Sequence, residues 1–491
     1  MELIFEKSRS GRKGVTLPAN DTGLESGLPS RYLREKGAEL PSVSEPEVVR
    51  HFTGLSKMNF GVDSHFYPLG SCTMKYNPKF TEKIASYEKF TSLHPLAPQL
   101  VTGAGLTQGA LEVISRLEGL LSEITGMDAF TTHPMAGAHG ELTGVMLIAA
   151  YHRHKGSRKK YVLIPDSGHG TNPASAAIAG YTVKSIPSDN RGSMDMARFA
   201  AELNDEVAAV MLTCPNTLGV FNRDIKKIAD LTHKAGALMY YDGANLNAIM
   251  GKARPGDLGF DVVHLNLHKS FATPHGGGGP GSGPVGVKKE LEPFLPISRV
   301  VKDKDGTYSL DYDKPLSIGY ISPFYGNFGV MLKAYAYILL LGRQGLINVS
   351  ENAVLNANYL MRHLSEKYDV PYADNCLHEF VISASRQAAR GVRAIDIAKA
   401  LIDKGIHPPT VYFPLIVKEA MMVEPTETES RDTLDQFIGV MMELALLAEK
   451  EPERFHAMPV TTPVGRLDEV KAARDMDIAC LPLEQCSCAK A

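Results

Sequence analysis

The 491-residue sequence has no tryptophan, only six cysteines, no long apolar run and a formal charge of −3 at pH 7. A charge this close to zero excludes strong electrostatic attraction to nucleic acids or acidic membranes, so the basic run at 152–160 is interpreted as a solvated loop. No apolar run approaches the roughly 18 residues of a membrane span. The charged N-terminal stretch, MELIFEKSRSGRKG, lacks the apolar core of a secretory signal. We therefore expect a cytoplasmic protein that binds neither nucleic acid nor membrane.

The cysteines are too few and too scattered for a disulfide framework. They stand at positions 72, 214, 376, 480, 486 and 488, a distribution typical of a reducing compartment. Cys486 and Cys488 could bind a metal or respond to the redox state of the cell. No second pair stands at zinc-finger spacing, so we interpret them as part of a frayed tail.

Changes of pattern divide the chain into four parts. Residues 1–75 are rich in Gly, Pro and Ser and are predicted to form an N-terminal arm, with a short helix near 46–55. In 76–329 strands alternate with helices, which indicates a large α/β domain around a mainly parallel sheet. Residues 330–460 are predicted to form a small α+β domain, and 461–491 a C-terminal tail.

Apolar periodicity places the individual elements. Strands are predicted over 160–165, 181–186, 207–213, 237–241, 261–267 and 380–383. Helices are predicted over 108–126, 195–203, 225–235, 329–346, 348–367, 393–404 and 432–450. Ligands of parallel sheets sit at the carboxyl ends of the strands. His169, Thr217, Asp242 and Lys269 all follow predicted strands, so one crevice could receive all four.

The stretch VVHLNLHKSFATPHGGGGPGSGP at 262–284 is the most informative in the chain. It places Lys269 at the end of an apolar run, beside histidines and a flexible glycine-rich loop. A lysine in such a place is a candidate for a Schiff base with pyridoxal phosphate. A solvated surface lysine is the alternative.

Three further residues fit the ring of this cofactor. Asp242, after the preceding strand, could keep the pyridine nitrogen protonated, because a buried carboxylate stays charged beside a cation. Ala244 is small enough to lie under the ring, and His169 could stack on its other face. A turn cap at Asp242 and a loop histidine at 169 are the alternatives. The order of all these features along the chain favours the cofactor.

The phosphate has a candidate site at MAGAHGE, 135–141, where a helix is predicted to begin. Small residues such as Gly137 and Ala138 leave the first backbone N–H groups open to an anion. Packing of small residues at a helix start is the alternative. Thr217, in the loop 214–219, is the remaining predicted cofactor contact.

Three other classes of protein can be weighed. Gly276, Gly278 and Gly281 match the spacing of a nucleotide-binding loop, but Pro280 and Pro284 prevent a helix from opening there. A metal hydrolase could use the histidines at 264, 268 and 275, but no glutamate stands between the first two as in HExxH. A non-catalytic scaffold, with Lys269 merely structural, is the third possibility.

Seven long motifs resemble one family of fold type I, aminotransferase-like pyridoxal-phosphate enzymes. They are PLGSCTMKYNP (68–78), MAGAHGE (135–141), DSGHGTNPASA (166–176), CPNTLGVF (214–221), DGANLNA (242–248), HLNLHKSFATPHGGGGPGSGP (264–284) and LNANYL (355–360). Together they resemble the glycine decarboxylase, or P-protein, of the glycine cleavage system. The chain lacks room for two aminotransferase-like halves, so it resembles the lysine-bearing half of the split form. The resemblance implies a seven-stranded-type sheet, a partner subunit 1 and a two-plus-two heterotetramer.

The resemblance also implies the reaction. Glycine would lose its carboxylate as CO2, and the aminomethyl group would pass to the lipoyl arm of H-protein. Either His268 or His169 could handle protons. The loop Ser71–Lys75 is expected near the active site, the glycine-rich loop 276–283 is expected to line the channel for the lipoyl arm, and 326–329 could serve a vestigial site of the partner.

Another fold type I decarboxylase, or an aminotransferase, is the alternative function. An aminotransferase normally needs an arginine for the substrate carboxylate. Arg386, Arg390 and Arg393 in the predicted small domain are candidates, so the sequence leaves this alternative open.

Overall fold

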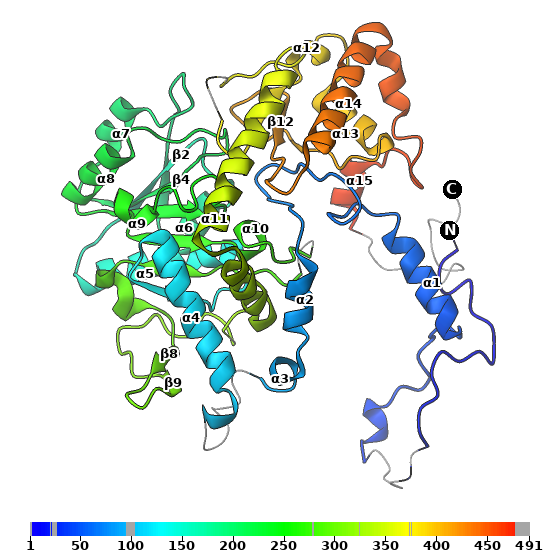
Figure 1. The fold of residues 1–491 in the computed structure, drawn as a ribbon, viewed down its shortest axis with the longest axis horizontal. Helices are drawn as coiled ribbons and strands as arrows, with labels where there is room; N and C mark the ends of the chain where they lie inside the picture. Colours follow the sequence, from blue (N-terminus) through cyan, green and yellow to red (C-terminus); the bar gives the residue numbers. More distant parts are fainter. Residues whose placement is uncertain are drawn as a thin grey trace. The chain divides into compact units, whose positions relative to one another are not determined.

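The computed structural model describes residues 2–19, 21, 27–94, 104–276, 279–323, 325–372, 374 and 376–476 (Figure 1). The chain forms two compact units, Met1–Gly61 and Val62–Ala491. The terminal cysteines Cys486 and Cys488 lie outside the described residues.

The first unit contains the 3-10 helix η1 (Ser30–Tyr32) and one longer helix, α1 (Glu45–Ser56). The sequence explains where α1 begins, because Ser44 and Glu47 form a capping box. The backbone N–H of Ser44 donates to Glu47 Oε2 at 2.8 Å. The predicted helix near 46–55 is confirmed.

The second unit begins with an α/β region. Its elements in chain order are α2 (Lys79–Ala85), α3 (Glu88–Thr91), η3 (Ala104–Leu106), α4 (Gln108–Thr125), β1 (Ala129–Thr131), α5 (Gly137–His154), β2 (Tyr161–Pro165), α6 (Asn172–Ile178), β3 (Thr182–Ile186), α7 (Met196–Glu202), β4 (Val207–Thr213), α8 (Ile225–Lys234), β5 (Leu238–Gly243), α9 (Pro255–Leu258), β6 (Val262–Leu265), α10 (Leu267–Ser270), β7 (Val285–Val287), η4 (Lys289–Phe294), β8 (Arg299–Lys302) and β9 (Tyr308–Asp311). The predicted alternation of strands and helices is confirmed.

Seven of these strands form one sheet in the order β1-β7-β6-β5-β4-β2-β3. Neighbours from β3 to β6 are parallel, and β7 is antiparallel to both β6 and β1. The prediction of a mainly parallel, seven-stranded sheet is therefore confirmed. In the register of β5 with β6, Asp242 pairs with His264, so two polar residues meet at the carboxyl edge.

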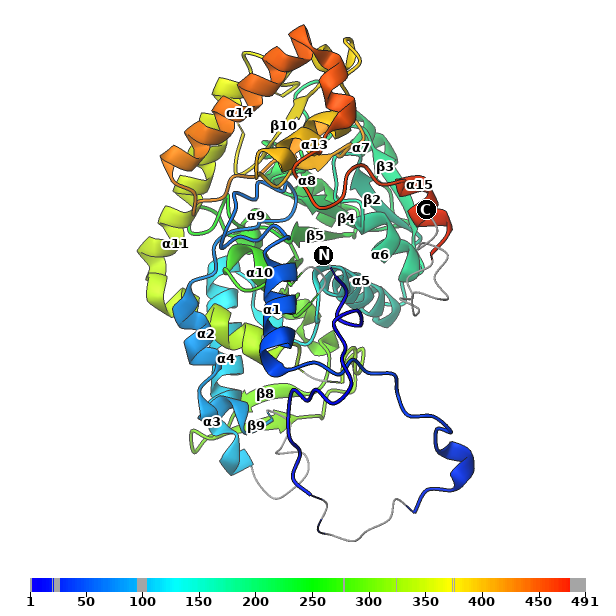
Figure 2. The same ribbon diagram turned by 90° about the vertical axis from the view of Figure 1, so that its right-hand side faces the viewer.

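Both faces of the sheet are buried, which explains why its inner strands are continuous apolar runs. Along β4, Val210 and Leu212 pack into a core with α4, α8 and the first half of the long helix described below. Ala209 and Met211 pack into a second core with α5 and α6. Figure 2 shows α5 and α6 beside the strands of the sheet.

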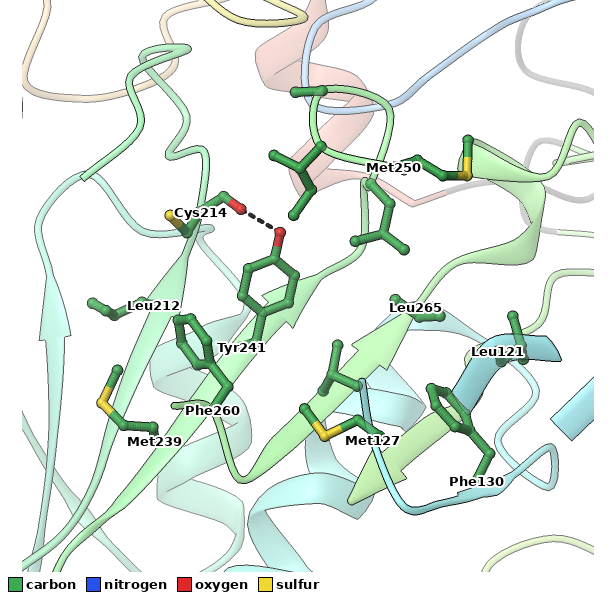
Figure 3. Packing of buried hydrophobic residues seen from close by; sticks show 14 of the residues in the cluster. Leu121, Met127, Phe130, Leu212, Cys214, Met239, Tyr241, Met250, Phe260 and Leu265 are labelled. Atoms are coloured by element: carbon green, nitrogen blue, oxygen red, sulfur yellow. Dashed lines mark hydrogen bonds between the residues drawn. The ribbon is translucent and has the colours of Figure 1, made fainter. Parts of the chain in front are cut away.

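The first of these cores anchors the strand end that carries Asp242 (Figure 3). Tyr241 is fully buried and packs edge-on against Phe260, with ring centroids 4.9 Å apart. Its hydroxyl donates a hydrogen bond to the backbone oxygen of Cys214, which ties β5 to the loop after β4. The neighbouring Asp242 is thereby held in a fixed place.

A smaller α+β region completes the chain. Its elements are α11 (Phe328–Leu364), β10 (Phe380–Ser383), α12 (Ser385–Ala388), α13 (Ala394–Asp403), β11 (Thr410–Val411), β12 (Ala420–Val423), α14 (Arg431–Lys450), η5 (Pro452–Ala457) and α15 (Glu469–Arg474). Strands β10, β12 and β11 form an antiparallel sheet in that order. A separate core joins this sheet to α13, α14 and the second half of α11.

Helix α11 connects the two regions and differs from its prediction (Figure 1). Helices were expected over 329–346 and 348–367, but the break lies at Gly342, where φ is 57° and ψ is −170°. Glycine tolerates this positive φ, which explains the position of the break. The helix is long and apolar enough to cross a membrane by length and composition alone. Its two halves instead contribute to the two cores, as a core helix does.

The strand predicted over 261–267 is too long. Strand β6 ends at Leu265, and α10 then makes one helical turn that contains Lys269. Asn266 begins this turn, since its carbonyl accepts the backbone N–H of Lys269 at 3.0 Å. Lys269 is thus on a short helix one step beyond the strand.

Candidate functional site

Lys269 is buried at the carboxyl edge of the sheet, with 6% of its surface exposed. Its Nζ donates a hydrogen bond to the backbone oxygen of Ser71 at 2.6 Å. Ser71 has a φ of 63°, in the left-handed region that a serine rarely adopts. The predicted placement of the loop Ser71–Lys75 beside the site agrees with this contact.

The far end of the same loop carries a second buried lysine. Lys75 Nζ lies 2.6 Å from Glu427 Oε1, and these side chains are 1% and 7% exposed. The same ammonium donates to the backbone oxygen of Ser270 at 2.9 Å and to Asn247 Oδ1 at 3.3 Å. Lys75 thereby fixes the turn that carries Lys269.

Asp242 is the last residue but one of β5 and is buried. Its Oδ2 accepts from Asn172 Nδ2 at 2.8 Å and from the hydroxyl of Thr213 at 3.3 Å, and its Oδ1 accepts from the backbone N–H of Ala244 at 3.1 Å. Burial alone would raise the pKa of Asp242, but His264, His169 and these donors outweigh it and hold the pKa below its usual value. The carboxylate is therefore ionised at neutral pH.

His264 lies beside Asp242, with Nε2 3.4 Å from Asp242 Oδ1. Burial lowers the pKa of His264 to about 4, so the ring is neutral and the contact is not an ion pair. Its Nδ1 is 2.9 Å from the hydroxyl of Tyr240. Burial raises the pKa of Tyr240 well above its usual value, so this hydroxyl keeps its proton.

His169 stands in the loop after β2 and is half-buried. Its Nδ1 lies 2.7 Å from the hydroxyl of Thr171, which in turn lies 2.6 Å from Glu141 Oε1. Burial lowers the pKa of His169; Asp242 opposes this shift and the charge of Lys269 adds to it. The side chains of His169, Asp242 and Glu141 bring their polar atoms within 4.8 Å of one another, so these three groups lie together at the edge of the sheet.

Helix α5 begins at Gly137, directly after the extended residue Ala136. Ala138 is exposed, whereas Gly137 and Gly140 are buried, so the first turn of this 18-residue helix reaches solvent at Ala138. A Cβ on Gly137 would lie 2.6 Å from the side chain of Asn266, and one on Gly283 would lie 2.1 Å from the carbonyl oxygen of Ala136. Glycine is thus required at both positions for Asn266 and the glycine-rich loop to approach the helix start.

Two predicted site residues use their polar atoms within the protein. The Nδ1 of His268 accepts from the backbone N–H of Ser282 at 3.3 Å, and burial, Lys269 and His275 lower the pKa of His268 to about 3. The hydroxyl of Thr217 donates to the backbone oxygen of Ser167 at 2.9 Å.

The predicted channel loop and the segment 326–329 meet. Asn327 Nδ2 donates to the backbone oxygen of Gly281 at 2.6 Å. A Cβ on Gly326 would lie 2.3 Å from the carbonyl oxygen of Thr132, in the same chain. Asn327 therefore holds the backbone at Gly281, and Gly326 packs against Thr132, both within this chain.

A buried pair of carboxyl groups near Ser71 is not predicted from the sequence. The register Phe380↔Val423 of β10 and β12 brings the adjoining residues Glu379 and Glu424 together. The backbone N–H of Ser71 donates to Glu379 Oε2 at 2.8 Å. Burial, then Glu424, raises the pKa of Glu379 to about 8, and burial raises that of Glu424 to about 7. The only sign of this pair in the sequence is an acidic residue directly beside each of the two apolar strands. The sequence predicts no more for the acidic stretch 424–429 than that it precedes a helix.

The rival sites do not assemble. Arg386 pairs with Asp369 at 2.6 Å, Arg393 lies 3.6 Å from Glu419 Oε1, and both arginines and Arg390 are exposed. In the described parts of the chain, the side chains close enough to share a metal are Glu141 with His169 and Asp242, and His378 with Glu379 and Glu424. The three histidines proposed for a metal hydrolase form no such group.

The residues at this edge fit pyridoxal phosphate. A buried primary amine, Lys269, is present, and its charge reaches the histidines around Asp242. Asp242 is an ionised carboxylate with an orienting donor set, which is what a protonated pyridine nitrogen requires. The first turn of α5, which begins at Gly137 and is exposed at Ala138, has backbone N–H groups that suit a phosphate.

Comparisons with known proteins agree with this geometry. Residues 23–311 match the family model described as glycine cleavage system P-protein, and residues 349–454 match glycine dehydrogenase, C-terminal domain. A probable glycine dehydrogenase (decarboxylating) subunit 2 from Caldanaerobacter subterraneus subsp. tengcongensis is 58% identical over 477 residues, which cover 96% of this chain and 97% of the relative.

Solved structures show the same fold. A glycine decarboxylase (P-protein) in inhibitor-bound form matches with a TM-score of 0.71 and 21% identity, over 85% of this chain and 93% of that one. A sphingosine-1-phosphate lyase from Burkholderia pseudomallei matches with a TM-score of 0.63 and 12% identity, over 94% and 99%. The predicted fold type I architecture is confirmed, and the chain belongs to the family of glycine cleavage system P-proteins.

Proposed function

We propose that Lys269 holds pyridoxal phosphate covalently through Nζ and that the site around it decarboxylates glycine. Pyridoxal-phosphate-dependent glycine decarboxylation is the activity of the family to which the chain belongs. The observation that carries the proposal for these residues is the placement of Lys269 and Asp242. The ionised carboxylate lies at the carboxyl end of β5, and the buried amine follows the neighbouring strand β6. The alternative of an aminotransferase is not favoured, because the candidate arginines are exposed.

The cofactor, when bound, supplies an electron sink for the bond that breaks. Asp242 would hold the pyridine nitrogen, and its low pKa keeps it ionised for that task. Ala244, half-buried directly after β5, would leave room beneath the ring, and His169 would cover the other face. The backbone N–H groups of Gly137 and Ala138 would bind the phosphate.

Proton handling is assigned to His169 and not to His268. Burial, Lys269 and His275 lower the pKa of His268 to about 3, so this ring is a weak base at neutral pH. His169 engages Thr171 through Nδ1, which leaves Nε2 to face a substrate. Thr217 is predicted as a cofactor contact, but its hydroxyl donates to the backbone oxygen of Ser167, so we propose that it orders this loop.

The assembly is also a proposal. Relatives carry the name subunit 2, which supports a partner subunit 1, and we infer a two-plus-two heterotetramer that passes the aminomethyl group to lipoylated H-protein. The thiols of Cys72, Cys214 and Cys376 are free, in keeping with a reducing cytoplasm.

One experiment tests the site. The chain, mixed with subunit 1 and pyridoxal phosphate, should absorb in the visible and should exchange labelled bicarbonate into the carboxyl group of glycine when H-protein is present. Lys269→Ala should abolish both signals. Lys227→Ala, at an exposed lysine of α8, is the matched control and should retain them. A Lys269→Ala protein that keeps the band would refute the assignment of Lys269, and equal exchange into alanine would refute that of glycine.

A further inference from the structure

Glu141 and Thr171 form a hydrogen-bonded chain that ends on His169. Glu141 Oε1 lies 2.6 Å from Thr171 Oγ1, and this hydroxyl lies 2.7 Å from His169 Nδ1. A hydroxyl has one hydrogen to donate. Thr171 can therefore donate to Glu141 or to His169, and the other group must donate to Thr171.

The second oxygen of Glu141 accepts hydrogen bonds from two side chains. Glu141 Oε2 accepts from Asn172 Nδ2 at 3.0 Å and from the hydroxyl of Ser175 at 3.3 Å. A proton on Glu141 thus belongs on Oε1, where it points at Thr171. Asn172 Nδ2 also donates to Asp242 Oδ2 at 2.8 Å, so one amide joins two buried carboxyl groups.

We propose that Glu141 is a proton store for His169 and that Thr171 is the relay between them. In the loaded form, Glu141 donates to Thr171, Thr171 donates to Nδ1, and the proton of the neutral imidazole is on Nε2. In the unloaded form, Glu141 is ionised, Thr171 donates to Glu141, and Nδ1 donates to Thr171. Nε2 then carries no proton and can act as a base.

The relay balances in protons. When Nε2 gives its proton to a substrate atom, Thr171 passes its own proton to Nδ1 and receives the proton of Glu141. The imidazole stays neutral at the start and at the end. The charge appears on Glu141, away from the reacting atoms.

The groups around the relay favour a neutral imidazole at His169 and a carboxyl group at Glu141 that can hold or release a proton. Burial, then the charge of Asp242, raises the pKa of Glu141 to about 7. Burial disfavours a charged His169 and Lys269 adds to this effect; together they outweigh Asp242, so the pKa of His169 is lowered. The backbone N–H of Thr171 also points at Nδ1 from 3.4 Å, which suits the loaded form. Among the other neighbours on packed elements, Tyr240 and His264 are neutral at pH 7, for the reasons given above.

The inference deepens the proposed function, since it rests on His169 acting there, but one of its tests is independent of activity. In the full chain labelled with 15N-histidine and free of cofactor, the signals of His169 are assigned by loss in His169→Gln. The 15N shifts should change from the Nε2–H to the Nδ1–H tautomer as pH rises through about 7.

Three variants separate the relay from a structural role. Thr171→Val removes the hydroxyl, so the tautomer of His169 should no longer follow the titration of Glu141, while Thr171→Ser should restore the change. In Glu141→Gln, the donors Asn172 and Ser175 require the amide oxygen on their side. The amide NH2 then faces Thr171, and His169 should keep the Nε2–H tautomer from pH 6 to 9.

Kinetics in the complete enzyme form the second test. Thr171→Val should lower the rate of bicarbonate exchange by about 10- to 100-fold, with the KM for glycine changed less than about twofold, because proton transfer contributes to the transition state and not to binding. Thr171→Ser should stay within about threefold. If the tautomer of His169 still changes with pH in Thr171→Val, the relay is overturned. If a chelator abolishes the tautomer change in the wild type, the relay is also overturned, because Glu141, His169 and Asp242 would then be assigned to a metal. If the tautomer result holds but activity does not depend on His169, the proposed function of His169 fails while the relay stands.

Discussion

Removal of the Lys75 ammonium should destabilise the second unit strongly. In Lys75→Met, Glu427 is left buried without its partner at 2.6 Å, and the backbone oxygen of Ser270 loses its donor. Burial alone would lower the pKa of Lys75, but Glu427 outweighs it and raises the pKa, so the wild-type pair is charged. Removing one partner of a buried ion pair costs about 3–5 kcal/mol, because an uncompensated charge remains. We expect a loss in this range.

Replacing both partners should recover most of this loss. In Lys75→Met/Glu427→Leu no charge is left buried, and apolar replacements of buried pairs are often close to neutral. The measurement is urea unfolding of the full chain followed by circular dichroism, with the slope of the transition compared between variants. Lys160→Met, in the exposed pair with Glu206, is the control and should shift the midpoint little. A loss below about 1 kcal/mol in Lys75→Met, or a double variant no more stable than the single one, would refute the reasoning.

Two further changes test the surroundings of Lys269. Gly283→Ala places a Cβ 2.1 Å from the carbonyl oxygen of Ala136, so the start of α5 must move. The affinity for pyridoxal phosphate, measured by absorbance titration, should fall at least about 10-fold. An affinity equal to that of the wild type would contradict a phosphate site at the start of α5. Glu379 has a pKa raised to about 8 by burial and Glu424, so its contribution to stability is present below its unfolded value of 4.5 and is lost as pH rises through 8. The thermal midpoint should therefore fall between pH 6 and 9 in the wild type and fall less in Glu379→Gln; equal slopes would show that this carboxyl group does not titrate there.

Much of the sheet could be predicted because its strands are buried on both faces. Such strands are continuous apolar runs, and the residue that follows each run lies at the carboxyl edge. This reasoning located Asp242 and His169 from the sequence alone. It placed Lys269 at a strand end, whereas the chain turns at Asn266 into the short helix α10. One helical turn has too little periodicity to be seen in a sequence.

The acidic pair could not be predicted, because it depends on pairing between distant segments. Glu379 precedes β10 and Glu424 follows β12, and only the antiparallel register of these strands joins them. Each glutamate, taken alone, is an ordinary charge next to a strand. The break in α11 was misplaced for a related reason: Gly342 adopts a positive φ there, whereas other glycines, such as Gly329, stand inside the same helix. The sequence does not show which glycine breaks the helix.

The division of roles between Asp242 and Glu141 follows from their neighbours. The two carboxyl groups share the amide of Asn172, and neither is exposed to water, so ionising both is costly. Asp242 also accepts hydrogen bonds from the backbone N–H of Ala244 and the hydroxyl of Thr213, and its pKa is lowered, so it is the group that stays ionised. Glu141 is then the group that takes up a proton near neutral pH. A protonated pyridine nitrogen needs a carboxylate that stays ionised, which is Asp242. The imidazole of His169 needs a group that supplies protons, which is Glu141. The amide of Asn172 binds both carboxyl groups and so allows two adjacent groups to have these opposite roles.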